Sequence, residues 1–251
     1  MAQDRKKAGY GEDDMSRFAG WDALADDVFG LNVRGFRTMW AAVFNPARVF
    51  EAARDPDWLG RYTPAIRLVF VIMALTMTLQ FLWAYEGSSL WNSVQEAIAS
   101  FEAELDGRDP GSVTREIILA FAVLYPVAYF TLHIPASLLI GFWGKGVTLP
   151  VRSRLYFSTI VPAGLVSLAV VIVQHALEPE PSQASSIAAL AILILAYSVT
   201  IFRGLAPAMP AGGRLWRAGL MTLVMVILSG IAEFIALLAA CIYVLGTPSI
   251  G

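Results

Sequence analysis

Five stretches of this chain are apolar and almost free of charged side chains over the length that a membrane-spanning helix needs. A helix rises about 1.5 Å per residue, so roughly twenty apolar residues cross the hydrocarbon core of a bilayer. Because lipid offers no partners for backbone N–H and C=O groups, such stretches must be helical. They run approximately over Thr63–Tyr85, Ile117–Trp143, Leu155–Ala176, Ser185–Ile201 and Ala218–Leu245. The sequence therefore predicts an all-α integral membrane protein with five transmembrane helices.

The composition agrees with a chain that is mostly in lipid, because 57% of the residues are apolar and only 15% are charged. The single cysteine, Cys241, excludes an internal disulfide and a cysteine-based metal cluster. We expect no metal centre, because such sites usually take three or four ligands and the only histidines are His133 and His175. The sequence holds no P-loop, no HExxH or GxSxG motif and no nucleic-acid-binding pattern, so we predict no catalytic residue and no nucleic-acid partner.

Charged residues are sorted between the loops. The loops after the second and fourth apolar stretches hold basic residues and no acid, namely Lys145, Arg152 and Arg154 in one and Arg203, Arg214 and Arg217 in the other. The loop over 86–116 is mainly acidic, and Glu178 and Glu180 are the only charges in the loop that contains them. The positive-inside rule places the basic loops in the cytoplasm. This predicts a membrane protein with its N-terminus in the cytoplasm and its C-terminus outside.

The predicted organisation is one helix bundle with polar extensions. In chain order we expect a flexible cytoplasmic segment over 1–30, cytoplasmic interfacial helices over 31–62, the bundle over 63–246 with a periplasmic amphipathic helix over 89–106, and a periplasmic tail over 247–251. Aromatic residues near the ends of the spans are interpreted as anchors in the membrane interface. These are Trp58, Tyr62, Trp83, Tyr85, Trp91, Trp143 and Trp216.

The helices outside the spans are predicted to be amphipathic. The first cytoplasmic helix places apolar residues on one face and arginines on the other, with Val33, Phe36, Trp40 and Val43 against Arg34 and Arg37. Asn45 is predicted to cap the next helix, with Pro46 at its first position. The periplasmic helix has apolar residues at steps of three and four, namely Trp91, Val94, Ile98, Phe101 and Leu105. We expect this face to rest on the membrane or on other helices, or to dock on a second protein.

Glu233 lies inside the fifth apolar stretch. An ionised carboxylate at the centre of a bilayer costs about 2.5–3.5 kcal/mol on insertion scales. We therefore expect Glu233 to be protonated, paired or facing water. A neutral Glu233 that donates a hydrogen bond to a neighbouring helix is the structural alternative to a functional role.

The second apolar stretch carries a polar stripe, because Tyr125, Tyr129, His133 and Ser137 recur at every fourth position. Such a stripe should face the interior of the bundle, where its side chains find partners. We hypothesise that Glu233 and this stripe share an intramembrane polar site. Structural hydrogen bonding is the alternative, and His133 as an axial ligand to haem or a chlorin is a further one, since a single imidazole suffices.

Small residues in the fifth stretch predict a helix-packing face, either inside the chain or between chains. They are Gly230, Ala232, Ala236 and Ala240. Small side chains allow two helix backbones to approach closely.

The segment NPARVFEAARDPDW, residues 45–58, precedes the first of the five spans and resembles the start of the membrane domain in the bacterial branch of the Yip-domain proteins. The phrases GRYTPAIRLVF and YFTLHIPASLLIGFW are similar to an uncharacterised family of small bacterial membrane proteins. These resemblances imply a five-span protein with a cytoplasmic N-terminus and an amphipathic segment ahead of the first span. They supply no catalytic residue, and the role of eukaryotic Yip proteins in vesicle traffic is not transferred.

The expected function is that of a non-enzymatic accessory, scaffold or assembly subunit of a complex in the bacterial inner membrane. Its expected partners are the lipid bilayer and either other membrane protein subunits or further copies of the chain. Two other function classes stay open. One is a small proton- or solute-coupled transporter or channel that uses Glu233 and His133, and the other is a lipid- or pigment-binding membrane protein.

Overall fold

A computed structural model describes residues 33–55, 58–86, 88–100, 105, 107–144, 146–177 and 182–246. The regular structure of these residues is entirely helical. The predicted flexible segment 1–30 and the tail 247–251 lie outside the described residues, as do residues 101–104 of the predicted periplasmic helix.

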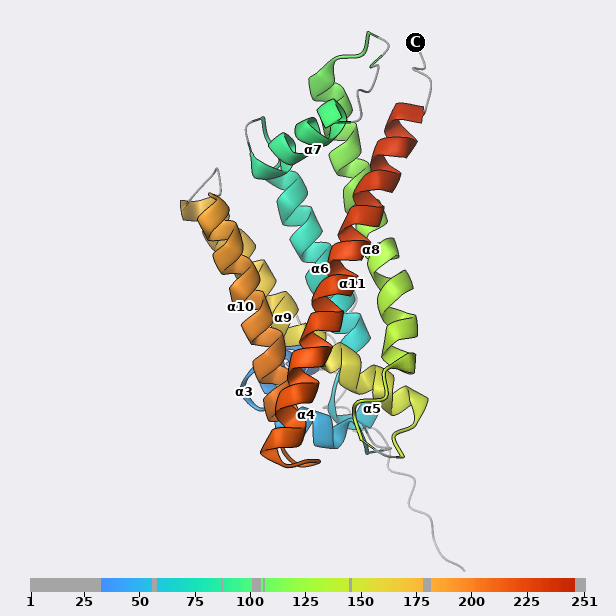
Figure 1. Cartoon of the computed structure of the whole chain (residues 1–251), viewed down its shortest axis with the longest axis vertical. Helices are drawn as coiled ribbons and strands as arrows, with labels where there is room; N and C mark the ends of the chain where they lie inside the picture. The colour runs from blue at the N-terminus through green and yellow to red at the C-terminus, as the bar shows by residue number, and fades with distance from the viewer. Residues whose placement is uncertain are drawn as a thin grey trace, which may run out of the picture.

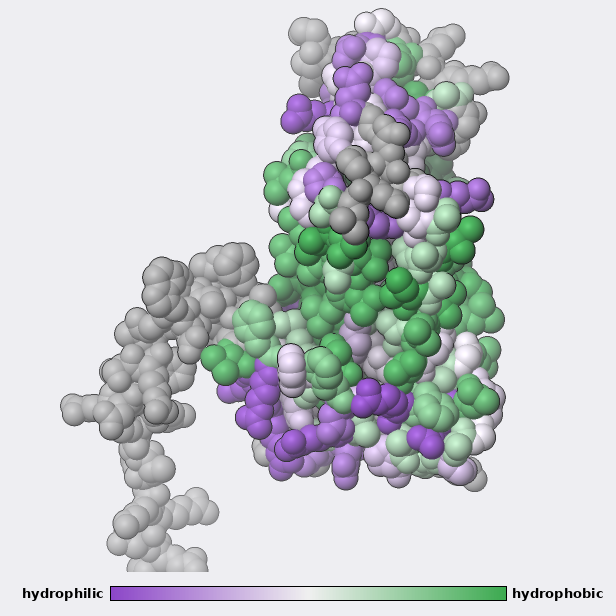
Figure 2. Space-filling model, turned by 90° about the vertical axis from the view of Figure 1, so that its left-hand side faces the viewer, coloured by the Kyte–Doolittle hydropathy of each residue, from purple (hydrophilic) through white to green (hydrophobic). Residues whose placement is uncertain are grey.

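Five of the described helices are long and apolar enough to cross a membrane, which confirms the predicted all-α class and agrees with the predicted number of spans. They are α6 (Ala65–Leu82), α8 (Pro110–Leu139), α9 (Leu149–Leu177), α10 (Gln183–Gly204) and α11 (Ala211–Gly246). Successive long helices run in opposite directions along the bundle (Figure 1). On the face shown in Figure 2, a broad apolar belt crosses the middle of the molecule and polar residues gather at both ends.

The long helices form a ring. Around it, α6 packs on α8, α8 on α11, α11 on α10, α10 on α9, and α9 on α6. Helix α9 runs obliquely and also packs on α8, so it crosses the ring beneath its centre (Figure 1). The ring therefore has a closed lower half and leaves space in the half that is nearer to α7 (Ser89–Ser100).

Helix α8 begins earlier than predicted, at Pro110 rather than Ile117. Asp109 caps it, because its side chain accepts a hydrogen bond from the Ser112 backbone N–H at 2.8 Å. Pro110 occupies the first turn, where a missing N–H has no consequence for the helix. The polar residues ahead of Ile117 are thus part of the same helix.

Helix α8 also ends earlier than predicted, at Leu139 rather than Trp143. The segment that follows contains Gly144 at φ 119° and Gly146 at φ 74°. Positive φ angles of this kind suit glycine and interrupt a right-handed helix. The chain turns here and places Trp143 beneath the bundle.

Three short helices cover the end of the bundle opposite α7: α3 (Val33–Phe44), α4 (Pro46–Ala52) and α5 (Trp58–Arg61). We call α3, α4 and α5 the collar. The predicted cap is confirmed, because the Asn45 side chain accepts a hydrogen bond from the Arg48 backbone N–H and Pro46 begins α4. Gly204 of α10 lets the Phe50 ring of α4 lie directly against the helix backbone.

Arginine side chains from the long helices hold the collar. The C-terminal carbonyls of a helix have no partner within it, so donors from elsewhere stabilise them. Arg203 of α10 donates to the Phe44 carbonyl at 2.7 Å, and Arg154 of α9 donates to the Ala53 carbonyl at 3.4 Å. The ends of α3 and α4 are thereby attached to the bundle.

The outward face of α3 differs in one residue from the predicted apolar face. Val33, Phe36 and Trp40 are exposed as predicted, but Phe44 completes the stripe and Val43 is partly buried. The opposite face of α3 packs on the bundle through residues such as Met39 and Ala42. We call Val33, Phe36, Trp40 and Phe44 the α3 stripe.

The prediction of interface anchors is wrong for most of these aromatic residues, because they belong to the core. At the collar end of the bundle, Trp58, Tyr62 and Trp143 are buried, with exposed fractions of 1%, 7% and 0%. Trp143 packs edge-on against Phe50, with ring centroids 5.7 Å apart. Helix α7 buries Trp91 together with Val94 and Ile98, so its apolar face rests on the other helices, chiefly on α8. Of the predicted anchors, Tyr85 and Trp216 remain exposed.

Candidate functional site

A cavity of about 270 Å³ lies inside the ring of long helices. Each of the five helices contributes side chains to its wall, and Leu90 of α7 lies at its edge. The wall is asymmetric, because α6 and α9 contribute mostly apolar side chains whereas α8, α10 and α11 contribute most of the polar ones. The polar side chains are Thr76, Gln80, Tyr125, Tyr129, Ser167, Tyr197, Ser229 and Glu233.

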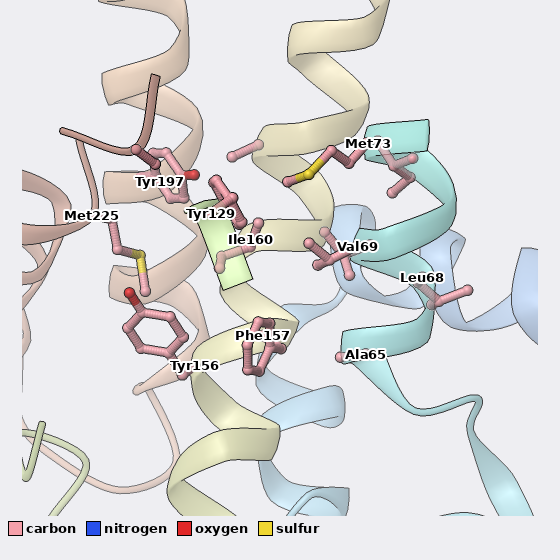
Figure 3. Packing of buried hydrophobic residues seen from close by; sticks show 14 of the residues in the cluster. Ala65, Leu68, Val69, Met73, Tyr129, Tyr156, Phe157, Ile160, Tyr197 and Met225 are labelled. Carbon is pink, nitrogen blue, oxygen red and sulfur yellow. The ribbon is translucent and has the colours of Figure 1, made fainter. Parts of the chain in front are cut away.

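Three tyrosines form the polar side of the cavity. Tyr125 and Tyr129 lie one turn apart on α8, and Tyr197 faces them from α10. Ser229 of α11 lines the same cavity as Tyr129 and Tyr197. Figure 3 shows Tyr129 and Tyr197 side by side above Tyr156. Three helices, α8, α10 and α11, thus each bring hydroxyl groups to the wall of the cavity.

His133 lies just beneath the cavity and is fully buried. Its Nδ1 atom is 2.8 Å from the Tyr156 hydroxyl of α9, and its Nε2 atom is 3.5 Å from the Ser229 hydroxyl. The Tyr129 ring stacks on the imidazole, with centroids 3.9 Å apart and planes 15° apart. Since one neutral imidazole nitrogen donates and the other accepts, this arrangement suits a neutral His133. His133 joins α8, α9 and α11 at the floor of the cavity.

Glu233 lines the cavity one helical turn beyond Ser229. Its side chain is also exposed, so the cavity is open to the surroundings of the bundle at this point. Glu233 and Tyr125 line the same cavity. Among the described residues, no hydrogen bond or ion pair to Glu233 is present, so the interhelical hydrogen bond that a structural role would need is not made in this structure.

The structure brings together most of the predicted polar site, but not all of it. Glu233, Tyr125 and Tyr129 share the cavity wall, and His133 reaches it through Ser229 rather than by contact with Glu233. The prediction that Ser137 belongs to the polar site is wrong. Ser137 is fully buried one turn below His133 and donates to the Ile134 carbonyl at 2.7 Å. Four residues make slightly more than one full turn of a helix, so the stripe on α8 winds around the helix toward Ser137. Because α9 crosses α8 at the level of Ser137, this end of the stripe packs in the closed half of the bundle.

The small-residue face of α11 packs inside the chain. Ala232, Ala236 and Ala240 are buried to 0%, 1% and 0% exposure, on the helix that packs most extensively along α8. The prediction that Gly230 belongs to this packing face is wrong. Gly230 is exposed, and a Cβ atom added to it would meet no atom within 4 Å. Two residues before Ala232 is roughly 200° around the helix, so Gly230 faces away from the packing face.

The position of His133 disfavours it as an axial ligand of haem or a chlorin. An axial ligand needs one free imidazole nitrogen that faces the cofactor. Both nitrogens of His133 have hydroxyl partners, and Tyr129 covers one face of the ring. The imidazole acts here as a connection between three helices.

Sequence reasoning missed Tyr156, Tyr197 and Ser229. Tyr197 interrupts the apolar run of α10, and Ser229 precedes Glu233 by one helical turn, so both had the kind of signal that identified the stripe on α8. Tyr156 lies close to the start of α9, and a tyrosine near the end of an apolar helix gives no sign of a polar site. Only the oblique course of α9 brings Tyr156 beneath His133.

Comparisons with known proteins identify no relative: no family model, no curated protein and no solved structure matches this chain. The resemblance to Yip-domain proteins therefore gains no support from them.

Proposed function

We propose that this chain is a non-enzymatic integral membrane protein that binds a small molecule of mixed polarity in the cavity between its five long helices. The observation that carries the proposal is the two-sided wall, with most of the hydroxyl groups and the carboxyl group on one side and mostly apolar side chains on the other. Ligand sites are typically concave and mostly apolar, with a few convergent polar groups.

The dimensions of the cavity support a small ligand. Its volume of about 270 Å³ is just below the common range of about 300–1,000 Å³ for ligand pockets. The opening at Glu233 gives such a molecule a path into the bundle. A molecule with a polar group and a short apolar part would place the polar group near Tyr125 and Tyr197 and the apolar part against Met73 and Met77.

Transport of a solute has less support than binding. Beneath His133 the bundle is closed by Tyr156, Phe157 and Met225, whose exposed fractions are 0%, 1% and 0%. A transporter would need a second state in which these side chains separate. Binding needs only the cavity that is present.

A role as an accessory subunit of a complex has less support in the structure than the amphipathic and small-residue faces of the sequence suggested. The small-residue face of α11 and the apolar face of α7 are both used within the chain, so neither is available to a partner. Among the described helices outside the five long ones, the α3 stripe is an apolar face that remains exposed. Beside Arg34 and Arg37, its chemistry suits a bilayer surface with anionic lipids better than a protein groove.

For the placement in the cell, we propose the inner membrane of a bacterium, with the collar in the cytoplasm. The collar end holds Arg48, Arg152 and Arg203, whereas the α7 end carries acidic residues such as Glu86 and Glu96. Basic residues favour the cytoplasmic side. The cavity then opens in the periplasmic half of the membrane.

The test is native mass spectrometry of the protein extracted in mild detergent, with a cavity-filling variant and a matched control. Ser167→Phe places a ring in the cavity, and Ala169→Phe places the same ring on the exposed face of the same helix. The proposal predicts a small-molecule adduct on the wild type and on Ala169→Phe that Ser167→Phe lacks. Equal adducts on all three proteins, or none on any of them, would contradict it.

A further inference from the structure

We propose that the ligand of the cavity is a small organic cation that carries alkyl groups, with Glu233 as its counter-ion. This inference rests on the proposed function, because it names the chemical class that the same cavity takes. It follows from a juxtaposition: one unpaired carboxyl group lies beside aromatic rings in a wall whose described side chains include no cation.

The charges around the cavity are one-sided. Among the described side chains that line it, Glu233 carries the only formal charge. The basic side chains nearest to the α7 end, Arg108 and Arg115, lie outside the cavity, and Arg108 is already paired with Glu116. An ionised carboxylate in apolar surroundings is stable only with a partner, and intramembrane carboxylates often act as counter-ions of ligands. A cationic ligand supplies that partner, whereas an anion would be repelled.

The aromatic rings add a second attraction for a cation. Cations are attracted to the faces of Tyr and Phe rings within about 6 Å of the centroid. Phe121, Tyr125 and Tyr129 follow one another along α8, with centroid distances of 5.5 Å and 5.9 Å between neighbours. Tyr197 lies across from them. Aromatic side chains beside a carboxylate are the surroundings in which proteins recognise alkylated ammonium groups.

The apolar part of the wall favours an alkylated cation over a metal ion. A metal ion such as Ca²⁺ takes about six to eight oxygen ligands that converge on one point. Among the described residues, no group of three or more carboxylate, histidine or cysteine side chains converges in this way. Ile72, Met73 and Leu193 instead offer contact surface for alkyl groups.

The experiment uses choline as the probe and compares it with its neutral isostere, in which a quaternary carbon replaces the nitrogen. The two molecules have nearly the same shape and differ in charge. The thermal unfolding midpoint of the purified full-length protein is measured against the concentration of each, since a ligand that binds the folded state stabilises it. The measurement is repeated for Glu233→Gln, which removes the charge, and for Glu233→Asp, which keeps it.

The proposal predicts that choline raises the midpoint of the wild type and that the isostere does not. The apparent dissociation constant for choline should be at least about tenfold weaker in Glu233→Gln, because the charge pair is lost, and partly restored in Glu233→Asp. Equal responses to choline and the isostere, or an unchanged response in Glu233→Gln, would overturn the inference. The absence of any choline response in the wild type would overturn it as well.

Failure of this inference is distinguishable from failure of the proposed function. If the isostere binds as well as choline, or if the native-mass adduct of the wild type is a neutral molecule, the cavity binds a ligand and only its class is wrong. If Ser167→Phe leaves both the adduct and the choline response unchanged, the cavity is not the binding site and both proposals fail.

Discussion

Gly204 of α10 and Phe50 of α4 are in contact so close that a Cβ atom on Gly204 would lie 2.5 Å from the Phe50 ring. No side-chain carbon is tolerated at that distance without a shift of the ring. This contact fixes the collar against the long helices at the point where Arg203 donates to the end of α3. The absence of a side chain on one residue thus determines how the two parts of the molecule pack.

Gly204→Ala should therefore displace Phe50 and destabilise the protein by about 1–3 kcal/mol, the usual effect of overpacking. The measurement is the thermal unfolding midpoint in detergent. Gly219→Ala is the control, because a Cβ atom there meets no atom within 4 Å. In a helix this control should be neutral or stabilise the protein by up to about 1 kcal/mol.

The contact between Gly204 and Phe50 also predicts how substitutions at the two residues combine. If the Phe50 ring is the cause, replacing it with a smaller side chain should relieve the effect of Gly204→Ala. The double variant Gly204→Ala/Phe50→Leu should then lose less stability than the sum of the two single variants, as expected for residues in contact. Simple additivity would mean that Gly204 acts through something other than Phe50.

Tyr156→Phe tests the floor of the cavity. The substitution removes the hydroxyl that lies 2.8 Å from His133 Nδ1 and leaves that nitrogen buried without a partner. The expected loss is about 1–3 kcal/mol of unfolding free energy. Tyr85→Phe on the exposed surface is the control and should change stability by less than about 0.5 kcal/mol. Equal behaviour of the two variants would show that His133 does not depend on Tyr156.

Glu233→Gln separates a binding role from a structural one. Glu233 has no hydrogen-bond partner among the described residues, so the unliganded protein should lose less than about 0.5 kcal/mol. The measurement is the unfolding midpoint without added ligand. Ser229→Ala is the comparison, since Ser229 is 3.5 Å from His133 and should be the more sensitive position. A large loss in Glu233→Gln would indicate a structural hydrogen bond and contradict the present assignment.

The proposed orientation is tested by labelling single cysteines in intact Gram-negative cells with a membrane-impermeant maleimide. Cys241 is 2% exposed and is first replaced by alanine to give a cysteine-free chain. Glu96→Cys on α7 should be labelled, because the proposed topology places it in the periplasm. Arg48→Cys on α4 should be labelled only after the cells are opened. The reverse pattern would invert the topology.

The sequence was sufficient for the number and type of the long apolar helices because their apolar length is a property of each segment alone. It was also sufficient for the cap at Asn45, where the local residues determine the structure. The ends of α8 were misplaced, since hydropathy does not register the cap at Asp109 or the glycine turn at Gly144. These two features depend on backbone geometry rather than on polarity.

The candidate site was only partly predictable for a different reason. Tyr125 and Tyr129 were found from their spacing on one helix, which fixes the face they share. The distances from His133 to Tyr156 and to Ser229 depend on how α9 and α11 cross α8, and no local pattern encodes a crossing. The buried state of Trp143 likewise required the collar to lie across the end of the bundle.

The most direct test of the central claim is an experimental structure of the protein in lipid nanodiscs, purified from its own membranes. The account predicts non-protein density in the cavity between Tyr125, Tyr197 and Glu233, in contact with the Glu233 carboxyl group. A cavity that holds only water, or one that has collapsed with Glu233 turned toward lipid or another subunit, would contradict it.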